Sequence, residues 1–286
     1  MHTLKFLAEV SANGVVERDF IVDGVPGVIW SPTSGAERAA VVLLGHGGGL
    51  HKKTPAQVAR AHQYVTGYGY HVVAIDAPGH GDRPRSPADE RARAELRQAM
   101  LAGDTEQVFA VSLRYGASLA ERAVPEWQAT LDALQELPGI GHEAPIGYGG
   151  GISLGTGIGI PLTAVEPRIR AAIFGGGFAV DDALIEAARK ISVPVQFLLP
   201  WDDEHVDRQS SLALFDAFAS EEKTLHANPG DHRTIRWFGL DTDFLPRHLG
   251  RPSADASSLL VNTAEQGPRG LTAAAVEIDA EHDGAR

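Results

Sequence analysis

The sequence predicts an α/β domain whose central sheet is mostly parallel. Short, continuously apolar runs, such as those at 39–44 and 70–75, alternate with longer segments of helical character. This alternation is typical of β-α-β crossovers, which place helices on both faces of a parallel sheet. A chain of 286 residues with 43% hydrophobic residues can bury a full core. We therefore expect one main domain over residues 1–249.

The predicted elements follow one another along almost the whole of this domain. The strands are expected at 15–22, 25–30, 39–44, 70–75, 145–149, 169–174, 193–199 and 223–227. The helices are expected at 55–66, within 88–137, from the serine motif to 161, at 181–190, at 209–219 and in a last segment ending at 249. Asp23-Gly24 joins the first two strands and suits a type I′ turn, because both central residues of that turn need a positive φ.

The helical segment at 88–137 is longer than one crossover needs. Pro125 is expected to mark the start of its last helix, at 126–137, because proline is favoured at the first helical position. Residues 85–123 are therefore predicted to form a small helical insertion over the carboxyl edge of the sheet. From residue 250 the composition shifts to Ala, Ser, Asp and Glu, which predicts a mobile tail over 250–286.

Charge and composition exclude several classes of partner. The net charge of -12 leaves no basic face for phosphates, so we expect neither nucleic acid nor a membrane surface as a partner. Small, neutral or apolar substrates fit this balance better. The chain has no cysteine, no leader-like apolar segment at its start and no long apolar run, so we expect a cytoplasmic protein. The oligomeric state stays open, with a homodimer among the alternatives.

The pattern Gly151-Ile152-Ser153-Leu154-Gly155 is the first candidate for chemistry. Glycines flank a serine in this way when the serine occupies a strained turn between a strand and a helix, where larger side chains collide with nearby backbone. The motif follows the predicted strand at 145–149 and precedes a helical segment. Ser153 is therefore the candidate nucleophile. A chain with 32 glycines can also produce the pattern by chance, and Ser153 would then only cap a helix.

A serine hydroxyl needs a base to take its proton and an acid to orient that base. His232 is the candidate base, because it lies in a loop at 228–232 between the last predicted strand and the last helix. Asp203 follows the strand at 193–199 and is the candidate acid. Asp202, its neighbour, is the alternative acid.

The same chemistry needs N–H donors for the negative charge on the carbonyl oxygen. The loop His46-Gly47-Gly48-Gly49 follows a predicted strand, and its glycines let backbone amides approach a substrate closely. We expect the oxyanion hole to use the amides of Gly48 and Leu154, with Gly47 and Gly49 as further candidates.

Four side chains near predicted strand ends are candidates for the substrate pocket, namely His46, Tyr148, Trp201 and Phe178. Large aromatic residues at such positions are also common in plain cores. The twelve histidines show no ligand spacing, and no phosphate-binding or dinucleotide-binding loop is evident. We therefore expect no metal and no cofactor.

Together these motifs resemble the α/β-hydrolase superfamily over about residues 15–249. The resemblance rests on the glycine loop at 46–49, Pro78-Gly79-His80-Gly81, the serine motif at 151–155, Asp203 and Gly230-Asp231-His232. It implies a catalytic triad of Ser153, Asp203 and His232, in the order of that superfamily. It favours Asp203 over Asp202, since the superfamily acid is usually followed three residues later by Val, here Val206.

Within the superfamily the chain is most similar to the serine esterase and dienelactone-hydrolase-like branch. Dienelactone hydrolases proper use a Cys nucleophile, which this chain lacks, so the resemblance implies ordinary ester hydrolysis. Gly149-Gly150-Gly151 stands where such families often carry an aromatic residue, and we expect it to loosen the strand or enlarge the pocket.

The expected function is that of a serine hydrolase that cleaves a carboxylic ester, or a related acyl bond, of a small-molecule substrate through an acyl-enzyme on Ser153. An acyltransferase, an amidase or a peptidase with the same triad remains an alternative, as does a non-catalytic ligand receptor on the same fold.

Overall fold

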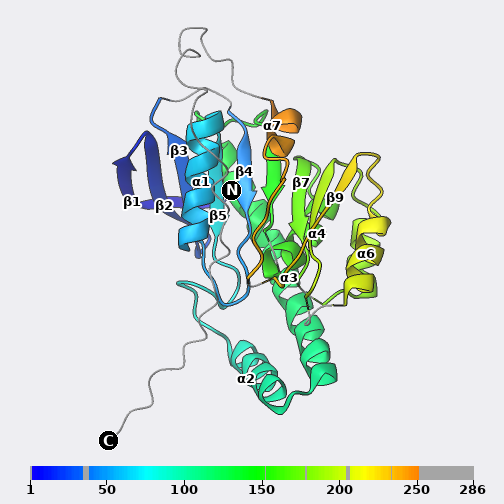
Figure 1. Cartoon of the computed structure of the whole chain (residues 1–286). Coiled ribbons are helices and arrows are strands. Elements are labelled where there is room, and N and C mark those ends of the chain that lie inside the picture. The colour runs from blue at the N-terminus through cyan, green and yellow to red at the C-terminus, as the bar shows by residue number, and fades with distance from the viewer. Residues whose placement is uncertain are drawn as a thin grey trace, which may run out of the picture.

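A computed structural model describes residues 2–34, 39–151, 153–177, 179–203, 207–232 and 234–250. Within these ranges nine strands form one sheet in the order β1-β2-β3-β5-β4-β6-β7-β8-β9 (Figure 1). The strands are β1 (Leu4–Ala12), β2 (Val15–Val22), β3 (Val25–Pro32), β4 (Val41–Leu44), β5 (His71–Ile75), β6 (Ile146–Gly149), β7 (Ile169–Gly175), β8 (Val195–Pro200) and β9 (Lys223–Asn228). The helices are α1 (Pro55–Tyr68), α2 (Pro87–Ala102), α3 (Thr105–Gln135), α4 (Leu154–Val165), α5 (Asp182–Ala188), α6 (Arg208–Ala217) and α7 (Phe244–Leu249). The predicted α/β-hydrolase fold class is confirmed.

The first three strands form an antiparallel ribbon at one side of the sheet. Asp23 and Gly24 have φ values of 47° and 88°, so the predicted type I′ turn is confirmed. Asn13 and Gly14 make a second turn of the same kind, with φ values of 51° and 79°. This turn joins β1 to β2, and β1 is a strand that the sequence reading did not include.

The other six strands are parallel to one another and follow the order β5-β4-β6-β7-β8-β9, so β4 lies between β5 and β6. The chain crosses from β4 to β5 through α1 and from β6 to β7 through α4, in opposite directions along the sheet. In open α/β sheets, ligands generally bind at the carboxyl edge beside such a reversal. The loops that follow β4 and β6 lie at this point, and they carry the glycine loop and the serine motif.

Two apolar layers cover the sheet. Side chains of α3, α4, α5 and α6 pack on one face, around Phe174 and Phe197. Side chains of α1 and α7 pack on the other face, around Trp30 and Tyr70. All four of these aromatic side chains are fully buried. The sheet therefore holds the loops of its carboxyl edge on a rigid base.

The helical insertion takes the form of a hairpin. A short connection at 103–104 joins α2 to α3, and the pair projects from the body of the domain (Figure 1). The prediction of a separate last helix at 126–137 is wrong, because α3 runs unbroken from Thr105 to Gln135 with Pro125 inside it. The loss of the Pro125 N–H leaves the carbonyl of Glu121 without its helical donor, and Glu121 is exposed, where water can replace that donor.

The ion pair between Arg122 and Asp89 joins the two helices of the hairpin, with an Nη2 to Oδ1 distance of 2.6 Å. None of the helices in the described ranges is long and apolar enough to cross a membrane. The predicted tail at 250–286 lies outside the described residues except for Gly250.

Candidate active site

Ser153 lies in a strained turn between β6 and α4. Its φ of 64° and ψ of -124° are rare for a residue with a side chain and cost of order 1–3 kcal/mol. The Ser153 N–H donates to the Gly176 carbonyl over 3.1 Å, and the Gly150 N–H donates to the Ile173 carbonyl over 2.9 Å. Both acceptors belong to β7 or the residue after it, so the neighbouring strand holds the turn in place. The Ser153 side chain caps no backbone N–H of α4.

The glycines of the motif are required for two different reasons. A Cβ on Gly155 would lie 2.0 Å from the Gly150 carbonyl oxygen, so a larger residue cannot fit there. Gly151 has more room, but its φ of 65° favours glycine. The steric argument made from the sequence therefore applies to Gly155. Gly151 is required because its backbone adopts a positive φ, which glycine tolerates best.

Tyr148 fills the space beneath this turn. Its hydroxyl donates to the Gly155 carbonyl over 2.5 Å, and a Cβ on Gly45, Gly150 or Gly159 would lie within 2.6 Å of the Tyr148 side chain. The elbow does have an aromatic support, placed one residue before the glycine run. The glycines make room for the tyrosine ring, and the expectation of a loosened strand or an enlarged pocket stays a prediction. Tyr148 is fully buried, so its assignment to the pocket lining is corrected.

His232 and Asp203 form a pair beside the carboxyl ends of β8 and β9. His232 Nδ1 lies 2.6 Å from Asp203 Oδ2, and the His232 backbone N–H donates to the same oxygen over 3.2 Å. The carboxylate is almost fully buried, at 4% exposure, while the imidazole is 19% exposed. With Nδ1–H donating to the carboxylate, Nε2 carries the lone pair that a general base needs.

Asp202 binds the same loop without touching the imidazole. Its Oδ2 accepts from the Gly230 N–H over 3.0 Å, and its own N–H donates to the Gly230 carbonyl over 3.2 Å. Adjacent acidic residues thus have separate partners, and Asp203 is the one that orients His232.

Gly48 and Gly49 of the candidate oxyanion loop have open space beside them. Nothing lies within 4 Å of the positions that a Cβ on Gly48 or on Gly49 would take. Gly49 has a φ of 78°, and the Leu50 N–H donates to the Gly47 carbonyl over 3.2 Å, which closes the loop as a turn. Across the described ranges, the backbone N–H groups of Gly48 and Leu154 donate to no protein acceptor.

An ion cluster fixes the chain just after the glycine loop, with Lys52 and Asp76 buried and Asp82 exposed. Lys52 Nζ lies 2.6 Å from Asp76 Oδ2 and 2.6 Å from Asp82 Oδ2, and Asp76 also accepts from the backbone N–H groups of Lys52 and Asp82. Burial by itself would raise the pKa of Asp76, but these donors together hold it below its ordinary value. Asp76 therefore stays charged and joins the loops that follow β4 and β5.

His46 makes a second link between the same two loops. Its Nδ1–H donates to the Gly47 carbonyl over 2.9 Å, and its Nε2 accepts from the Ala77 N–H over 3.0 Å. Burial lowers the pKa of His46 to about 4, so the ring is neutral at pH 7. Both ring nitrogens have backbone partners and the residue is only 4% exposed. His46 was expected in the substrate pocket, but the structure gives it a role in holding the loop.

The other two pocket candidates have different outcomes. Trp201 follows β8, is 42% exposed and packs against Arg208, whose Cζ lies 4.3 Å from the indole centroid. It stays a candidate for the pocket lining. Phe178 lies outside the described residues.

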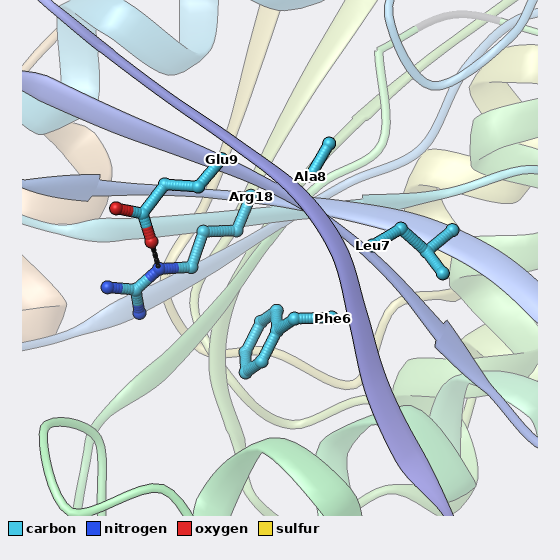
Figure 2. A pocket seen from close by; sticks show the side chains of 5 residues that line it. All are labelled: Phe6, Leu7, Ala8, Glu9 and Arg18. Carbon is cyan, nitrogen blue, oxygen red and sulfur yellow. Dashed lines mark hydrogen bonds and ion pairs between the residues drawn. The ribbon is translucent and has the colours of Figure 1, made fainter.

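A hollow elsewhere on the molecule does not compete with this site. It has a volume of about 330 Å³ and is lined by Phe6, Leu7, Ala8, Glu9 and Arg18 on β1 and β2 (Figure 2). Glu9 and Arg18 pair over 2.6 Å and are both exposed to solvent. Five strand spacings separate β1 from β6, which amounts to roughly 24 Å. The hollow has no nucleophile among its lining residues, so the carboxyl edge remains the candidate active site.

Several residues of the site were missed from the sequence. From the sequence alone, Lys52 and Asp76 look like ordinary loop charges, and Gln57 of α1 looks like a residue on a helix surface. In the structure, Gln57 Nε2 donates to the Gly45 carbonyl over 3.0 Å. Each contact joins segments that are separated in the chain, so no local sequence pattern predicts it. No group of metal-ligating side chains occurs in the part of the chain that the structure describes.

Comparisons with solved structures found proteins of similar fold. One similar protein is an esterase described as cold-adapted, from an Arctic intertidal metagenomic library. Its PEG-bound structure shares 33% sequence identity with this chain, covers 84% of this chain and 97% of that chain, and has a TM-score of 0.59. Its native structure gives 30% identity over 86% and 99%, with a TM-score of 0.57.

Acetyl xylan esterase 1 from Thermoanaerobacterium sp. JW/SL YS485 shares 15% identity over 87% of each chain, with a TM-score of 0.55, and supports the fold alone. No family model and no curated protein matches the sequence. The identity to the Arctic esterase, over nearly its whole length, shows the family: the chain belongs to the α/β-hydrolase superfamily.

Proposed function

We propose that this protein is a serine esterase that cleaves a carboxylic ester of a small molecule through an acyl-enzyme on Ser153. The observation that carries the proposal is the strained backbone of Ser153 together with the His232–Asp203 pair. Ser153 follows β6, Asp203 follows β8 and His232 follows β9, so all three lie at the carboxyl edge of one parallel sheet. The similarity to an esterase of known structure supports the same reaction.

In the proposed reaction His232 Nε2 takes the proton of the Ser153 hydroxyl as its Oγ attacks the ester carbonyl. Asp203 holds the ring in the tautomer that leaves Nε2 unprotonated and stabilises the imidazolium that forms. The protonated His232 then gives its proton to the departing alkoxide, and the alcohol leaves. Water, activated by the same imidazole, attacks the acyl-enzyme and releases the carboxylic acid.

The negative charge that develops on the carbonyl oxygen requires preorganised donors. The amides of Leu154 and Gly48 fit this role, because neither donates to another acceptor in the described residues. The Lys52–Asp76 cluster and the two bonds of His46 restrain the glycine loop before any substrate arrives. Such restraint lowers the reorganisation needed in the transition state.

The proposal is tested with Ser153→Ala and a panel of 4-nitrophenyl esters of graded acyl length. We expect Ser153→Ala to lower kcat at least about 10³-fold and to abolish labelling by a fluorophosphonate probe. Ser118→Ala, on the exposed side of α3, is the matched control and should retain wild-type rates and labelling. Full activity of Ser153→Ala would refute the proposal.

A further inference from the structure

Arg60 of α1 is half-buried and has no partner among the residues that the structure describes. Its guanidinium makes no hydrogen bond and no ion pair there. Two other half-buried arginines each bind a carboxylate, as Arg83 does with Glu126 and Arg122 does with Asp89. Partial burial of a cation is unfavourable unless an anion or hydrogen-bond acceptors compensate it. The environment of Arg60 is therefore suited to an anion that the protein itself does not supply.

The guanidinium lies beside the elbow. A Cβ on Gly151 would be 3.5 Å from Arg60 Nη1, in ordinary van der Waals contact. Gly151 is two residues before Ser153, so their Cα atoms are at most about 7 Å apart. An ester bound at Ser153 is thus within one small-molecule length of Arg60.

The position of Arg60 on its helix explains how it reaches this place. Helix α1 starts at the carboxyl edge of the sheet, and helical side chains lean toward the N-terminus of their helix. Gln57, one turn earlier, is already bound to the Gly45 carbonyl, which is also the nearest protein oxygen to the Cβ position of Gly151. Arg60 therefore lies near the residues that follow β4 and β6, at the carboxyl edge of the sheet.

The neighbouring ring of Tyr64 does not neutralise the guanidinium. Burial raises the pKa of Tyr64 to about 12, so the phenol is uncharged at pH 7. Among the described residues, no carboxylate forms an ion pair with Arg60, so its positive charge is not compensated there. A planar guanidinium with several N–H donors matches a carboxylate better than any neutral group.

We propose that Arg60 binds a carboxylate carried by the ester substrate, so that the natural substrate is a monoanionic ester and not a neutral one. This inference rests on the proposed esterase function and names its substrate class. It departs from the neutral substrate expected from the net charge of -12. A net charge describes the field far from the protein, whereas a binding site is governed by the charges within a few ångströms of the ligand.

Two matched substrate pairs place the carboxylate on either side of the ester. The acyl pair is 4-nitrophenyl hydrogen glutarate and 4-nitrophenyl pentanoate. The alcohol pair is 4-acetoxybenzoate and 4-acetoxybenzamide. For each pair the measured quantity is the ratio of kcat/KM for the anionic ester to kcat/KM for the neutral one, in wild type, Arg60→Gln, Arg60→Lys and Arg97→Gln.

We expect Arg60→Gln to lower this ratio at least tenfold in one of the pairs, mainly through a higher KM of the anionic ester. Arg60→Lys should lower it less, because the charge is retained while the two-pronged geometry is lost. Arg97 is an exposed residue of α2, so Arg97→Gln removes the same charge from the protein and should leave the ratio unchanged. A ratio that is the same in wild type and Arg60→Gln for both pairs overturns the proposal.

A binding measurement separates this proposal from the esterase proposal. Glutarate is titrated calorimetrically into wild type and Arg60→Gln, with no reaction taking place. Binding to the wild type that weakens at least tenfold in Arg60→Gln supports the carboxylate site whatever the enzyme does with esters. Equal binding by the two proteins, or none by the wild type, counts against Arg60. Loss of the esterase function would appear instead as an absence of turnover of every ester.

Discussion

Asp202 and Asp203 are neighbours in the chain but hold the histidine loop in different ways. Asp203 Oδ2 meets the imidazole Nδ1 of His232 at 2.6 Å, whereas Asp202 Oδ2 meets only the backbone N–H of Gly230. In the proposed reaction the first contact fixes a tautomer and supports a developing positive charge. The second contact fixes a loop. We therefore expect the two carboxylates to contribute to activity by different amounts.

Asp203→Asn is expected to lower kcat by about 10²- to 10⁴-fold, because an amide can present the wrong partner to Nδ1 and cannot stabilise the imidazolium. Asp202→Asn removes a charge that binds the backbone of Gly230, two residues before His232. The amide keeps an oxygen that can accept from Gly230, so the kcat of this variant should stay within about fivefold of wild type. Steady-state kinetics of the two variants on one 4-nitrophenyl ester makes the comparison. Equal losses in both variants would show that the acid assignment is wrong.

The sequence was informative at this scale wherever a residue is required by its immediate neighbours. The strained turn of Ser153 needs glycine at 151 and 155 for local reasons, so the motif could be read directly. The role of Tyr148 could not be predicted, because it depends on the contact of its hydroxyl with the Gly155 carbonyl at the start of α4. Arg60 likewise reads as one more basic residue of a helix until the elbow is placed beside it.

The glycine loop after β4 depends on His46 at the scale of an element. The ring bonds to the Gly47 carbonyl on one side and to the Ala77 N–H on the other, and only the neutral ring can do both. Protonation at Nε2 would turn the acceptor into a donor that faces another donor. The conformation of the loop is thus coupled to the charge state of one buried histidine.

Stability is therefore expected to fall on acidification between pH 6.5 and pH 4. Burial lowers the pKa of His46 to about 4 in the folded protein, while the unfolded chain has the ordinary value of 6.5. As the pH drops below 6.5 the unfolded state binds a proton that the folded state does not, so unfolding becomes easier. Between pH 7.5 and pH 5.0 this linkage amounts to about 2 kcal/mol of unfolding free energy.

Urea unfolding at these two pH values, in wild type and His46→Gln, isolates the contribution. The variant lacks the hydrogen bonds of the His46 ring at both pH values. The resulting loss of unfolding free energy is the same at each pH, so it cancels when the two pH values are compared. The drop in unfolding free energy should be smaller in His46→Gln than in wild type by roughly 2 kcal/mol. His142→Gln, which changes an exposed histidine, should behave as wild type does. An identical drop in wild type and His46→Gln would contradict the coupling.

Elements were predicted well where their signals are local and less well where packing decides. The parallel strands and the Asp23-Gly24 turn were read correctly from apolar runs and turn chemistry. Strand β1 was missed although Asn13-Gly14 marks its turn, because its side chains are nearly all exposed and its apolar pattern is weak. Helix α3 passes through Pro125 because both flanking halves have packing partners, α2 on one side and the sheet core on the other.

At the scale of the whole molecule the two edges of the parallel sheet have different tasks. The carboxyl edge carries Ser153, Asp203 and His232 on loops. The amino edge carries a network in which Arg168 binds the buried Glu166 just before β7 and reaches Asp132 and Gln135 near the end of α3, with N to O distances of 2.6–3.0 Å. This network joins α3, α4 and β7 at the side of the sheet away from the chemistry, so it should serve stability alone.

Arg168→Gln is accordingly expected to destabilise the protein without changing its turnover. Glu166 is 3% exposed, and burial would raise its pKa if Arg168 did not hold it down, so removal of the cation leaves a buried carboxylate without its partner. The cost is about 3 kcal/mol, or roughly 6–12 °C in Tm for a chain of this size. Calorimetry and steady-state kinetics at 25 °C measure the two quantities on the same preparation.

Two further variants show whether the buried charge is the cause. Glu166→Gln combined with Arg168→Gln removes both charges and should recover part of the lost Tm, because no uncompensated carboxylate remains. Arg189→Gln breaks the ion pair with Glu186, in which both side chains are about 60% exposed, and should change Tm by less than about 3 °C. A fall in kcat for Arg168→Gln with an unchanged Tm would mean that the amino edge influences the reaction. A fall in Tm with an unchanged kcat would show that this network serves stability and not turnover.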